Sequence, residues 1–410
     1  MLGIDQMLTA KYAGIQGMYY GSMAPVSAFA SAFLLYRGFD NSQIGSVIAL
    51  GAIGATILQM TFGGFVGSGR RISVRAMTSG LLVALLGLSI VLCTGLPGTG
   101  ATMVVYVSIM VLALALQPLV SSMNFSFQDR GIAINYGVAR AAGSVTYAIL
   151  SAIIGGAVAR YSGAAVPWFN ILTFGGMLLF VASFRLGKAA EDALPLRSPE
   201  PAPEDAASQP GERGFFRRNR GFLALLTGIA LVYLNLAATQ TYFLQIITSK
   251  GGDSVSLGIV AAIGAAMEIP MMIGFMWLSR RVKCGVLIQV SALFFTVKTV
   301  AILFAPDVTG LYFAQILHMF GYALFAPTSV YYVNQMMGEG DKVKGQAYLG
   351  SAMAIGSIGA SFAGGRILDA YGPQAMLQGA ITLSVVGNVV VVLAARAIRK
   401  RGESHAVRSV

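Results

Sequence analysis

The stretch LPLRSPEPAPEDAASQPGERG, residues 194–214, contains five of the 13 prolines in a chain of 410 residues, and it has no aromatic residue. Six apolar stretches precede it and six follow it, each of roughly 20 residues, which is the length that a helix needs to cross a membrane. The polar stretch cannot bury apolar area, so we expect a disordered linker, and a plain tether is favoured over a regulatory domain.

The apolar stretches predict an all-α membrane protein of twelve transmembrane helices in two pseudo-symmetric six-helix bundles. The predicted division is an N-terminal bundle at 1–185, a cytoplasmic linker at 186–220, a C-terminal bundle at 221–400 and a cytoplasmic tail at 401–410. The predicted spans are 12–36, 43–66, 76–96, 101–122, 136–159, 165–184, 221–245, 255–278, 284–304, 309–336, 345–366 and 373–397.

The two halves also resemble each other in sequence. IGSVIALGA from Ile44 corresponds to LGIVAAIGA from Leu257, and both spans end in a pair of arginines, at 70–71 and at 280–281. Such a repeat indicates two parallel six-helix halves, and in this arrangement a solute binds at the interface of the halves near mid-membrane.

Composition and charge agree with a membrane protein. Only 11% of the residues are charged, against about 25% in soluble domains. Of the 28 Lys and Arg residues, 22 fall on one side of the span map, so both termini are expected in the cytoplasm and the chain in the inner cell membrane. The net charge of +12 therefore comes from basic residues in short loops between the spans rather than on one face, so nucleic-acid binding is not expected.

The sequence contains no pattern that indicates an enzyme. No nucleophile–base pair or phosphate-binding glycine loop stands out, and the two cysteines have no metal-binding spacing. We expect no cofactor and no metal. The expected partners are a small-molecule substrate, protons and the lipid bilayer, and the architecture can function as a monomer.

Four ionisable residues lie inside predicted spans, where charge is costly unless it faces a cavity or a partner. Glu268 suits proton exchange because burial favours the neutral form of a carboxyl group; the alternative is a hydrogen-bonded structural role. Lys298 either neutralises Glu268 or reaches the membrane surface. His318 can change charge near neutral pH or serve as a neutral core residue. Arg140 either binds a solute's hydroxyl or carboxylate groups or contacts headgroups.

Uncharged polar and aromatic residues in the spans could complete a substrate-binding lining. Their aromatic faces, amides and hydroxyls suit sugars and nucleosides, although each could equally pack between helices. They are Tyr19, Tyr20, Ser121, Ser122, Asn124, Asn235, Gln240, Tyr242 and Tyr322.

Four motifs carry a resemblance to a known family: RGFDNSQIGSVIAL from residue 37, YGVARAAGSVTYAI from 136, GAAMEIPMM from 264 and QILHMF from 315. The chain resembles the major facilitator superfamily, in its lactose-permease-like, oligosaccharide:proton symporter branch, which also contains nucleoside and phenylpropionate permeases. The resemblance implies that Arg140 binds sugar, that Glu268 links substrate binding to protonation, that Lys298 replaces an arginine and that His318 belongs to the coupling network.

The chain departs from that family at three acidic positions. The acid one turn after His318 is absent, since Gly321 and Tyr322 stand there, and serines at 121 and 122 replace a fourth-helix acid. The seventh-helix acids are missing as well. Proton coupling would therefore depend on Glu268.

These observations predict a secondary active transporter that moves a small polar organic solute, first of all a sugar or oligosaccharide, by alternating access with proton symport. The alternative is an uncoupled or efflux carrier for nucleosides, aromatic acids or amphipathic compounds. A second alternative is a transporter-like membrane sensor that signals through the linker and tail.

Overall fold

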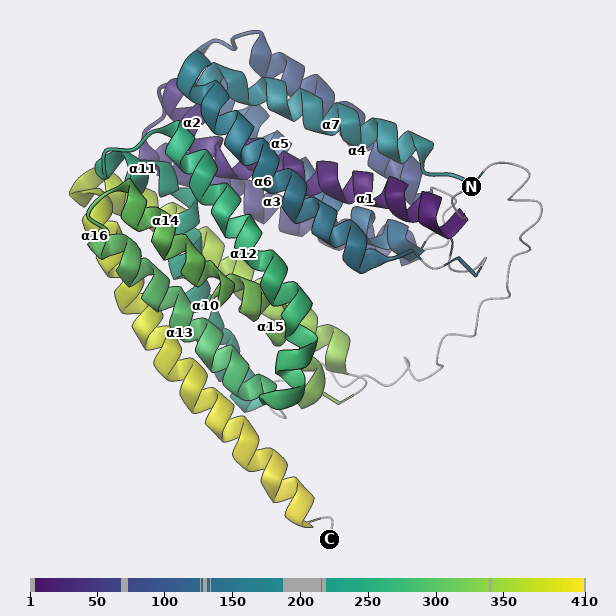
Figure 1. The fold of residues 1–410 in the computed structure, drawn as a ribbon, viewed down its shortest axis with the longest axis vertical. Helices are drawn as coiled ribbons and strands as arrows, with labels where there is room; N and C mark the ends of the chain where they lie inside the picture. The colour runs from purple at the N-terminus through teal and green to yellow at the C-terminus, as the bar shows by residue number, and fades with distance from the viewer. Residues whose placement is uncertain are drawn as a thin grey trace. The chain divides into compact units, whose positions relative to one another are not determined.

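The computed structural model describes residues 4–67, 73–125, 127, 131–132, 134–186, 215, 219–338 and 341–408. All regular elements among these residues are helices (Figure 1), which confirms the predicted all-α class. Most of the predicted linker, at 187–214 and 216–218, lies outside the described residues.

The chain divides into two compact units, one of residues 1–201 with 253–266 and one of residues 202–252 with 267–410. Before the linker, the helices are α1 Ile4–Met23, η1 Ala24–Ala28, α2 Ala30–Tyr36, α3 Asn41–Gly67, α4 Val74–Cys93, α5 Gly98–Ser122, η2 Met123–Phe125, α6 Tyr136–Tyr161, η4 Gly163–Ala165 and α7 Val166–Ser183. After it come α10 Arg220–Thr241, α11 Phe243–Ser249, α12 Ser254–Arg281, α13 Cys284–Phe304, α14 Val308–Ile316, η6 Leu317–Met319, α15 Tyr322–Met336 and α16 Lys342–Arg408.

Ten helical segments of the described chain are long and apolar enough to cross a membrane by length and composition. The first predicted span is not among them; it is divided into α1, η1 and α2, and α1 contains Asp5, Lys11 and two glutamines. The last two predicted spans form one of the ten because α16 runs through both, but Gly372 within it has a φ of 79° and separates two helices. Counting the first span and dividing α16 at Gly372 into two spans gives the twelve predicted spans. The final helix continues to Arg408, beyond the predicted end at 397.

In two of the broken spans, a buried tyrosine bonds a backbone carbonyl of its own unit. At the π-helical turn η1, which contains Pro25, the hydroxyl of Tyr106 donates to the carbonyls of Pro25 and Val26 at 3.3 and 3.2 Å. At the α10–α11 break, the hydroxyl of Tyr242 donates to Ser361 O at 2.5 Å. Broken helices are tolerated in apolar surroundings when such polar partners are present.

Glycines set how closely helices approach within each unit. A Cβ on Gly356 of α16 would lie 2.5 Å from the carbonyl of Ala230 on α10, and one on Gly387 would lie 2.9 Å from the carbonyl of Gly228. On α1, a Cβ on Gly21 would instead meet the end of the Leu150 side chain of α6, at 2.8 Å. Small residues of this kind allow membrane helices to pack backbone against backbone.

The turn after the first broken span is repeated after the second. Arg37 follows α2 and donates to the carbonyl of Leu96, while Lys250 follows α11 and donates to that of Leu303 at 3.2 Å. Each cation is followed by a glycine with φ near 80°. An aspartate then caps the next helix: Asp40 Oδ1 accepts from Gln43 N at 2.7 Å, and Asp253 Oδ1 accepts from Ser256 N at 3.0 Å. The internal repeat seen in the sequence thus extends to the hydrogen bonds of this turn.

Candidate functional site

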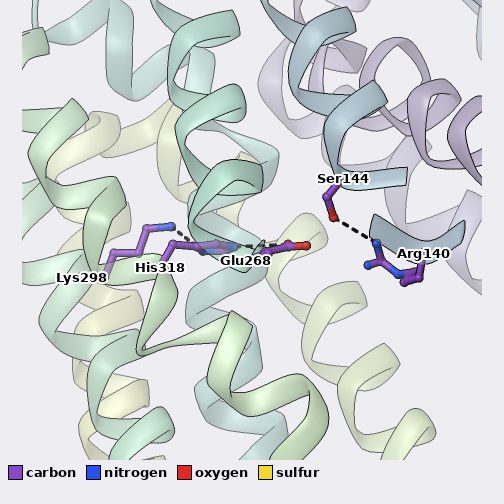
Figure 2. A network of polar contacts seen from close by, with 5 residues as sticks. All are labelled: Arg140, Ser144, Glu268, Lys298 and His318. Carbon is purple, nitrogen blue, oxygen red and sulfur yellow. Dashed lines mark hydrogen bonds and ion pairs between the residues drawn. The ribbon is translucent and has the colours of Figure 1, made fainter. Parts of the chain in front are cut away.

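Three titratable side chains form a chain of contacts in the second unit (Figure 2). They come from the middle of α12, the middle of α13 and the short η6 turn: Glu268, Lys298 and His318. Lys298 Nζ lies 3.1 Å from His318 Nδ1, and His318 Nε2 lies 3.7 Å from Glu268 Oε1. Lys298 and His318 are each 5% exposed, and we call the three residues the relay.

The contacts give the imidazole of His318 a direction. An ammonium group can only donate, so a charged Lys298 requires Nδ1 of His318 to accept. The hydrogen of the neutral ring is then on Nε2, which faces the carboxylate of Glu268. The distance of 3.7 Å between Nε2 and Oε1 is longer than that of a hydrogen bond. The ring therefore connects a cation on one side to a carboxylate on the other.

A break in the tenth span places His318 in the relay. α14 ends at Ile316, one 3-10 turn follows, and α15 begins at Tyr322. The ring of Tyr322 stacks on that of His318, with centroids 5.5 Å apart and an interplanar angle of 25°. Tyr322, predicted as a lining residue, therefore contacts the relay.

The first unit contains a different polar centre, built on α6 and α1. The guanidinium of Arg140 lies over the ring of Tyr20, 3.9 Å from its centroid, and Nη1 donates to Ser144 Oγ at 3.1 Å. Gly143 makes this possible, since a Cβ there would lie 2.7 Å from the Tyr20 ring. We call Arg140, Ser144 and Tyr20 the arginine centre; Figure 2 shows its hydrogen bond.

The position of Tyr20 bears on the two sequence interpretations of Arg140. Tyr20 is far from both ends of the first span, which runs from Ile4 to Tyr36. Because the guanidinium stacks on that ring, it lies at the depth of the span's interior rather than at the helix end. This location agrees with the bundle interior and not with headgroup contact, although no observation tests a binding role.

The remaining predicted lining residues have varied surroundings. Tyr19 is buried, with its ring edge-on to Tyr20 at 5.1 Å between centroids. Ser122 donates to Leu119 O within α5, and Ser121 beside it is half-buried. Asn124 follows in η2, and its Oδ1 is buried without a hydrogen-bond partner.

In the second unit, three predicted lining residues are not brought to the relay by any contact observed among the described residues. Asn235 is fully buried, and its Nδ2 donates to Phe295 O of α13 at 3.1 Å. Tyr242 is fully buried at the α10–α11 break, and Gln240 is exposed. Their role as binding residues stays a prediction.

Sequence reasoning missed some polar partners. Ser144 stands four residues after Arg140, a spacing that places both on one face of a helix and could have indicated the contact. No sequence spacing could have indicated a polar cluster in the second unit, because its residues belong to two helices, α13 and α16, that are far apart in the sequence. There Thr296 Oγ1 and Ser384 Oγ lie 2.6 Å apart, and Asn388 Nδ2 donates to Thr296 at 2.8 Å.

No group of three or more His, Cys, Asp or Glu side chains in the described parts of the chain could hold a metal ion. Cys93 and Cys284 are free thiols.

Comparisons with solved structures show the same fold. A crystal structure of the nucleoside transporter NupG matches with a TM-score of 0.75 at 14% identity, covering 97% of this chain and 100% of that one. The peptide transporter POT in complex with sulfate matches with a TM-score of 0.73 at 12% identity, covering 98% of this chain and 96% of that one.

Comparisons of sequence identify the family. Maltose permease of Geobacillus stearothermophilus is 25% identical over 273 residues, which is 66% of this chain and 65% of that protein. The match thus spans slightly less than two thirds of that relative's length. The model of the MFS_1 like family matches residues 10–378, which include both polar centres. The chain therefore belongs to the MFS_1 like family of the major facilitator superfamily, and its helices are those of a multi-pass membrane protein.

Proposed function

We propose that this chain imports a small polar organic solute together with protons, with sugars and oligosaccharides as the first solute class to test. The observation that carries the proposal is the relay, in which a carboxyl, an imidazole and an amine meet at mid-span depth. Ionisable groups inside membranes are costly and typically mark ion or proton pathways. The distant similarity to maltose permease supports sugars as the first class.

In the proposed cycle, Glu268 takes up a proton from the outside, and the arginine centre holds the solute's polar groups. Protonation removes a charge from the face of His318 and favours the loaded state. After the transporter has opened inward, Glu268 loses its proton and the solute leaves. The excess of basic residues on one side of the span map supports cytoplasmic termini and residence in the inner cell membrane. The cycle needs a single copy of the chain.

Nucleosides are a second candidate class. Tyr19 and Tyr20 place two aromatic rings beside Arg140, and such rings offer stacking faces for bases. The fold match to a nucleoside transporter is in accord with this candidate. The transporter-like sensor stays an alternative that binding without transport would support.

The direct test is uptake into liposomes by purified wild-type chain and by Glu268→Gln, driven by an inside-alkaline pH gradient. For one proton per solute, each pH unit supports about a 10-fold accumulation by wild type. Glu268→Gln should retain solute exchange between equal pH values but should not accumulate solute. Asp307→Asn is the matched control, because Asp307 caps α14 outside the span and asparagine caps as well. Full accumulation by Glu268→Gln would remove Glu268 as the proton carrier.

A further inference from the structure

The paired arginines that end the second and eighth predicted spans have no part in the proposed transport cycle. The first pair, at 70–71, lies outside the described residues, but Arg280 and Arg281 belong to the last turn of α12. Lys283 follows two residues later, and all three side chains are exposed. Within the described residues, none of the three makes an ion pair with a carboxylate. The end of α12 is therefore a strongly basic surface that the described carboxylates do not neutralise.

The length of α12 places these cations at the depth of lipid headgroups. The helix has 28 residues, which corresponds to about 42 Å at a rise of about 1.5 Å per residue. The hydrocarbon core of a bilayer is about 30 Å thick, and the headgroup layers extend it to about 40–45 Å. The last turn of α12 therefore reaches the headgroup layer, on the side that the distribution of basic residues predicts to be cytoplasmic.

An exposed apolar face of α12 leads up to the cations. Ile273, Met276 and Trp277 are spaced three or four residues apart on the helix, and we call them the Trp277 face. Ile273 is 78% exposed and Trp277 is 58% exposed. Tyr331 of α15 borders this face, because its hydroxyl donates to Sδ of Met276 at 3.3 Å. In a helix that crosses a membrane, an exposed apolar face contacts acyl chains, and tryptophan is enriched where the chains meet the headgroups.

Arg281 connects the basic surface to the Trp277 face. Its guanidinium carbon lies over the indole of Trp277, 4.1 Å from the ring centroid. No described residue accepts a hydrogen bond from this guanidinium, so its five N–H groups remain able to donate. A guanidinium donates pairs of parallel hydrogen bonds to phosphate oxygens. The cation is thus held beside an apolar face with its donors available to a phosphate group.

From this arrangement we infer that the end of α12 binds one phospholipid with a net negative headgroup. The phosphate and headgroup contact Arg280, Arg281 and Lys283, and an acyl chain lies along the Trp277 face. Clusters of basic residues at the cytoplasmic end of membrane helices attract anionic lipids. A zwitterionic lipid such as phosphatidylcholine brings its own cation and leaves the basic surface unbalanced. Phosphatidylglycerol has no such cation, so its charge complements the site.

Another stacked arginine of the second unit lacks these features and serves as a comparison. Arg366 lies over the ring of Phe362, 4.0 Å from its centroid, and donates to Phe362 O at 2.9 Å. No other cation stands within four residues of it in the sequence, and Asp369 follows three residues later. A guanidinium over an aromatic ring is therefore not sufficient for the inferred site, which also needs the neighbouring cations.

The two tryptophans of the chain make the site measurable. Trp168→Phe leaves Trp277 as the single tryptophan, and Trp277→Phe leaves Trp168 as the control. Each variant would be reconstituted into vesicles of equimolar phosphatidylglycerol and phosphatidylcholine, with bromine near the carbonyl end of the chains of one lipid or the other. From the quenching of Trp277, phosphatidylglycerol should bind about 5-fold or more tightly than phosphatidylcholine. Trp168 should show no such preference. Equal binding at Trp277, or the same preference at both tryptophans, would overturn the inference.

Variants in the Trp168→Phe background assign the preference to the cations. Arg281→Gln should lower it by about 5-fold, and replacing Arg280, Arg281 and Lys283 together by glutamine should abolish it. Raising the salt concentration should weaken it, because exposed charges are screened. Arg366→Gln is the matched control and should leave the preference unchanged. A preference that persists in the triple variant would contradict the site.

A free anion is distinguished from the lipid by competition. Millimolar inorganic phosphate, added at constant ionic strength, should not relieve the quenching of Trp277 by brominated phosphatidylglycerol, because the acyl chain along the Trp277 face contributes to binding. Relief of quenching by phosphate would assign the cations to a soluble anion and overturn the lipid. These measurements use no solute and no pH gradient, so their outcome is independent of the proposed transport function.

Discussion

The halves of the chain before and after the linker share a turn but differ in the charges inside their spans. Both contain a cation that bonds a distant carbonyl, a left-handed glycine and an aspartate cap, at residues 37–43 and 250–256. Inside the spans, the first unit holds a guanidinium that stacks on Tyr20 and bonds Ser144, whereas the second holds three titratable groups in a row. A repeated scaffold can thus carry unlike chemistry, and we infer that the first unit binds and the second couples.

The largest expected effect comes from breaking the relay at its cation. Lys298→Met keeps the length of the side chain but removes the group that faces Nδ1 of His318. We expect pH-driven accumulation to fall at least 10-fold, because His318 loses the charge that orients its proton toward Glu268. Solute exchange at equal pH should persist.

Lys250→Met is the control for that variant, since it removes a lysine that bonds Leu303 O beyond the relay. It should accumulate solute as wild type does. If Lys298→Met also accumulates solute fully, Lys298 has no part in coupling and the contrast between the units is reduced to Glu268 and His318.

A smaller effect is expected from a substitution where two helices pack closely through a glycine. A valine at Gly356 would clash with the backbone carbonyl of Ala230, which cannot move aside as a side chain can. We expect Gly356→Val to lower the stability of the detergent-solubilised chain by about 1–3 kcal/mol, measured as a fall in its melting temperature.

Two further variants calibrate that loss. Gly379→Val lies in the part of α16 that follows Gly372, with nothing within 4 Å of its Cβ, and should be near neutral. Gly21→Val in the first unit meets a flexible leucine end and should cost less than Gly356→Val. Equal losses at all three glycines would indicate a general cost of valine and no difference between the units.

The smallest effect concerns the repeated caps. Asp40→Ala and Asp253→Ala should each cost about 1 kcal/mol, because each removes the acceptor for a backbone N–H at a helix start. For Asp253, the N–H of Ser256 lowers the pKa of the carboxyl below 3.8. A lowered folded-state pKa means that the stabilisation is present above about pH 4 and is lost as the pH falls further.

Melting temperatures of Asp253→Ala and Asp253→Asn between neutral pH and pH 3 check the caps. Asparagine keeps the acceptor and should retain most of the stability at neutral pH. Losses that differ widely between positions 40 and 253 would show that the repeated hydrogen bonds are not energetically equivalent.

Much of the fold could be predicted from the sequence, because apolar runs of membrane-spanning length are rare elsewhere. Positions that depend on a few backbone angles or on side-chain partners could not. The π-helical turn at Pro25 and the break before Phe243 are stabilised by the hydroxyls of Tyr106 and Tyr242, which bond carbonyls of other helices or turns. No local pattern in the sequence indicates such partners.

The site was predictable to the extent that charge is scarce inside spans. Glu268, Lys298, His318 and Arg140 stand out in apolar sequence, and the structure brings the first three into one relay. Which atoms face each other could not be predicted, since the imidazole belongs to a 3-10 turn that interrupts its span. Asn235 shows the limit: its polarity suggested a lining residue, a role that stays a prediction, and no local pattern indicated that its amide bonds the backbone of α13.

The division between a binding unit and a coupling unit is tested most directly by one paired measurement in liposomes. Solute exchange at equal pH and accumulation under a pH gradient would be measured for wild type, Arg140→Gln and Glu268→Gln. We predict that Arg140→Gln loses both activities and that Glu268→Gln loses accumulation alone. Loss of both activities in Glu268→Gln, or undiminished exchange in Arg140→Gln, would contradict the division.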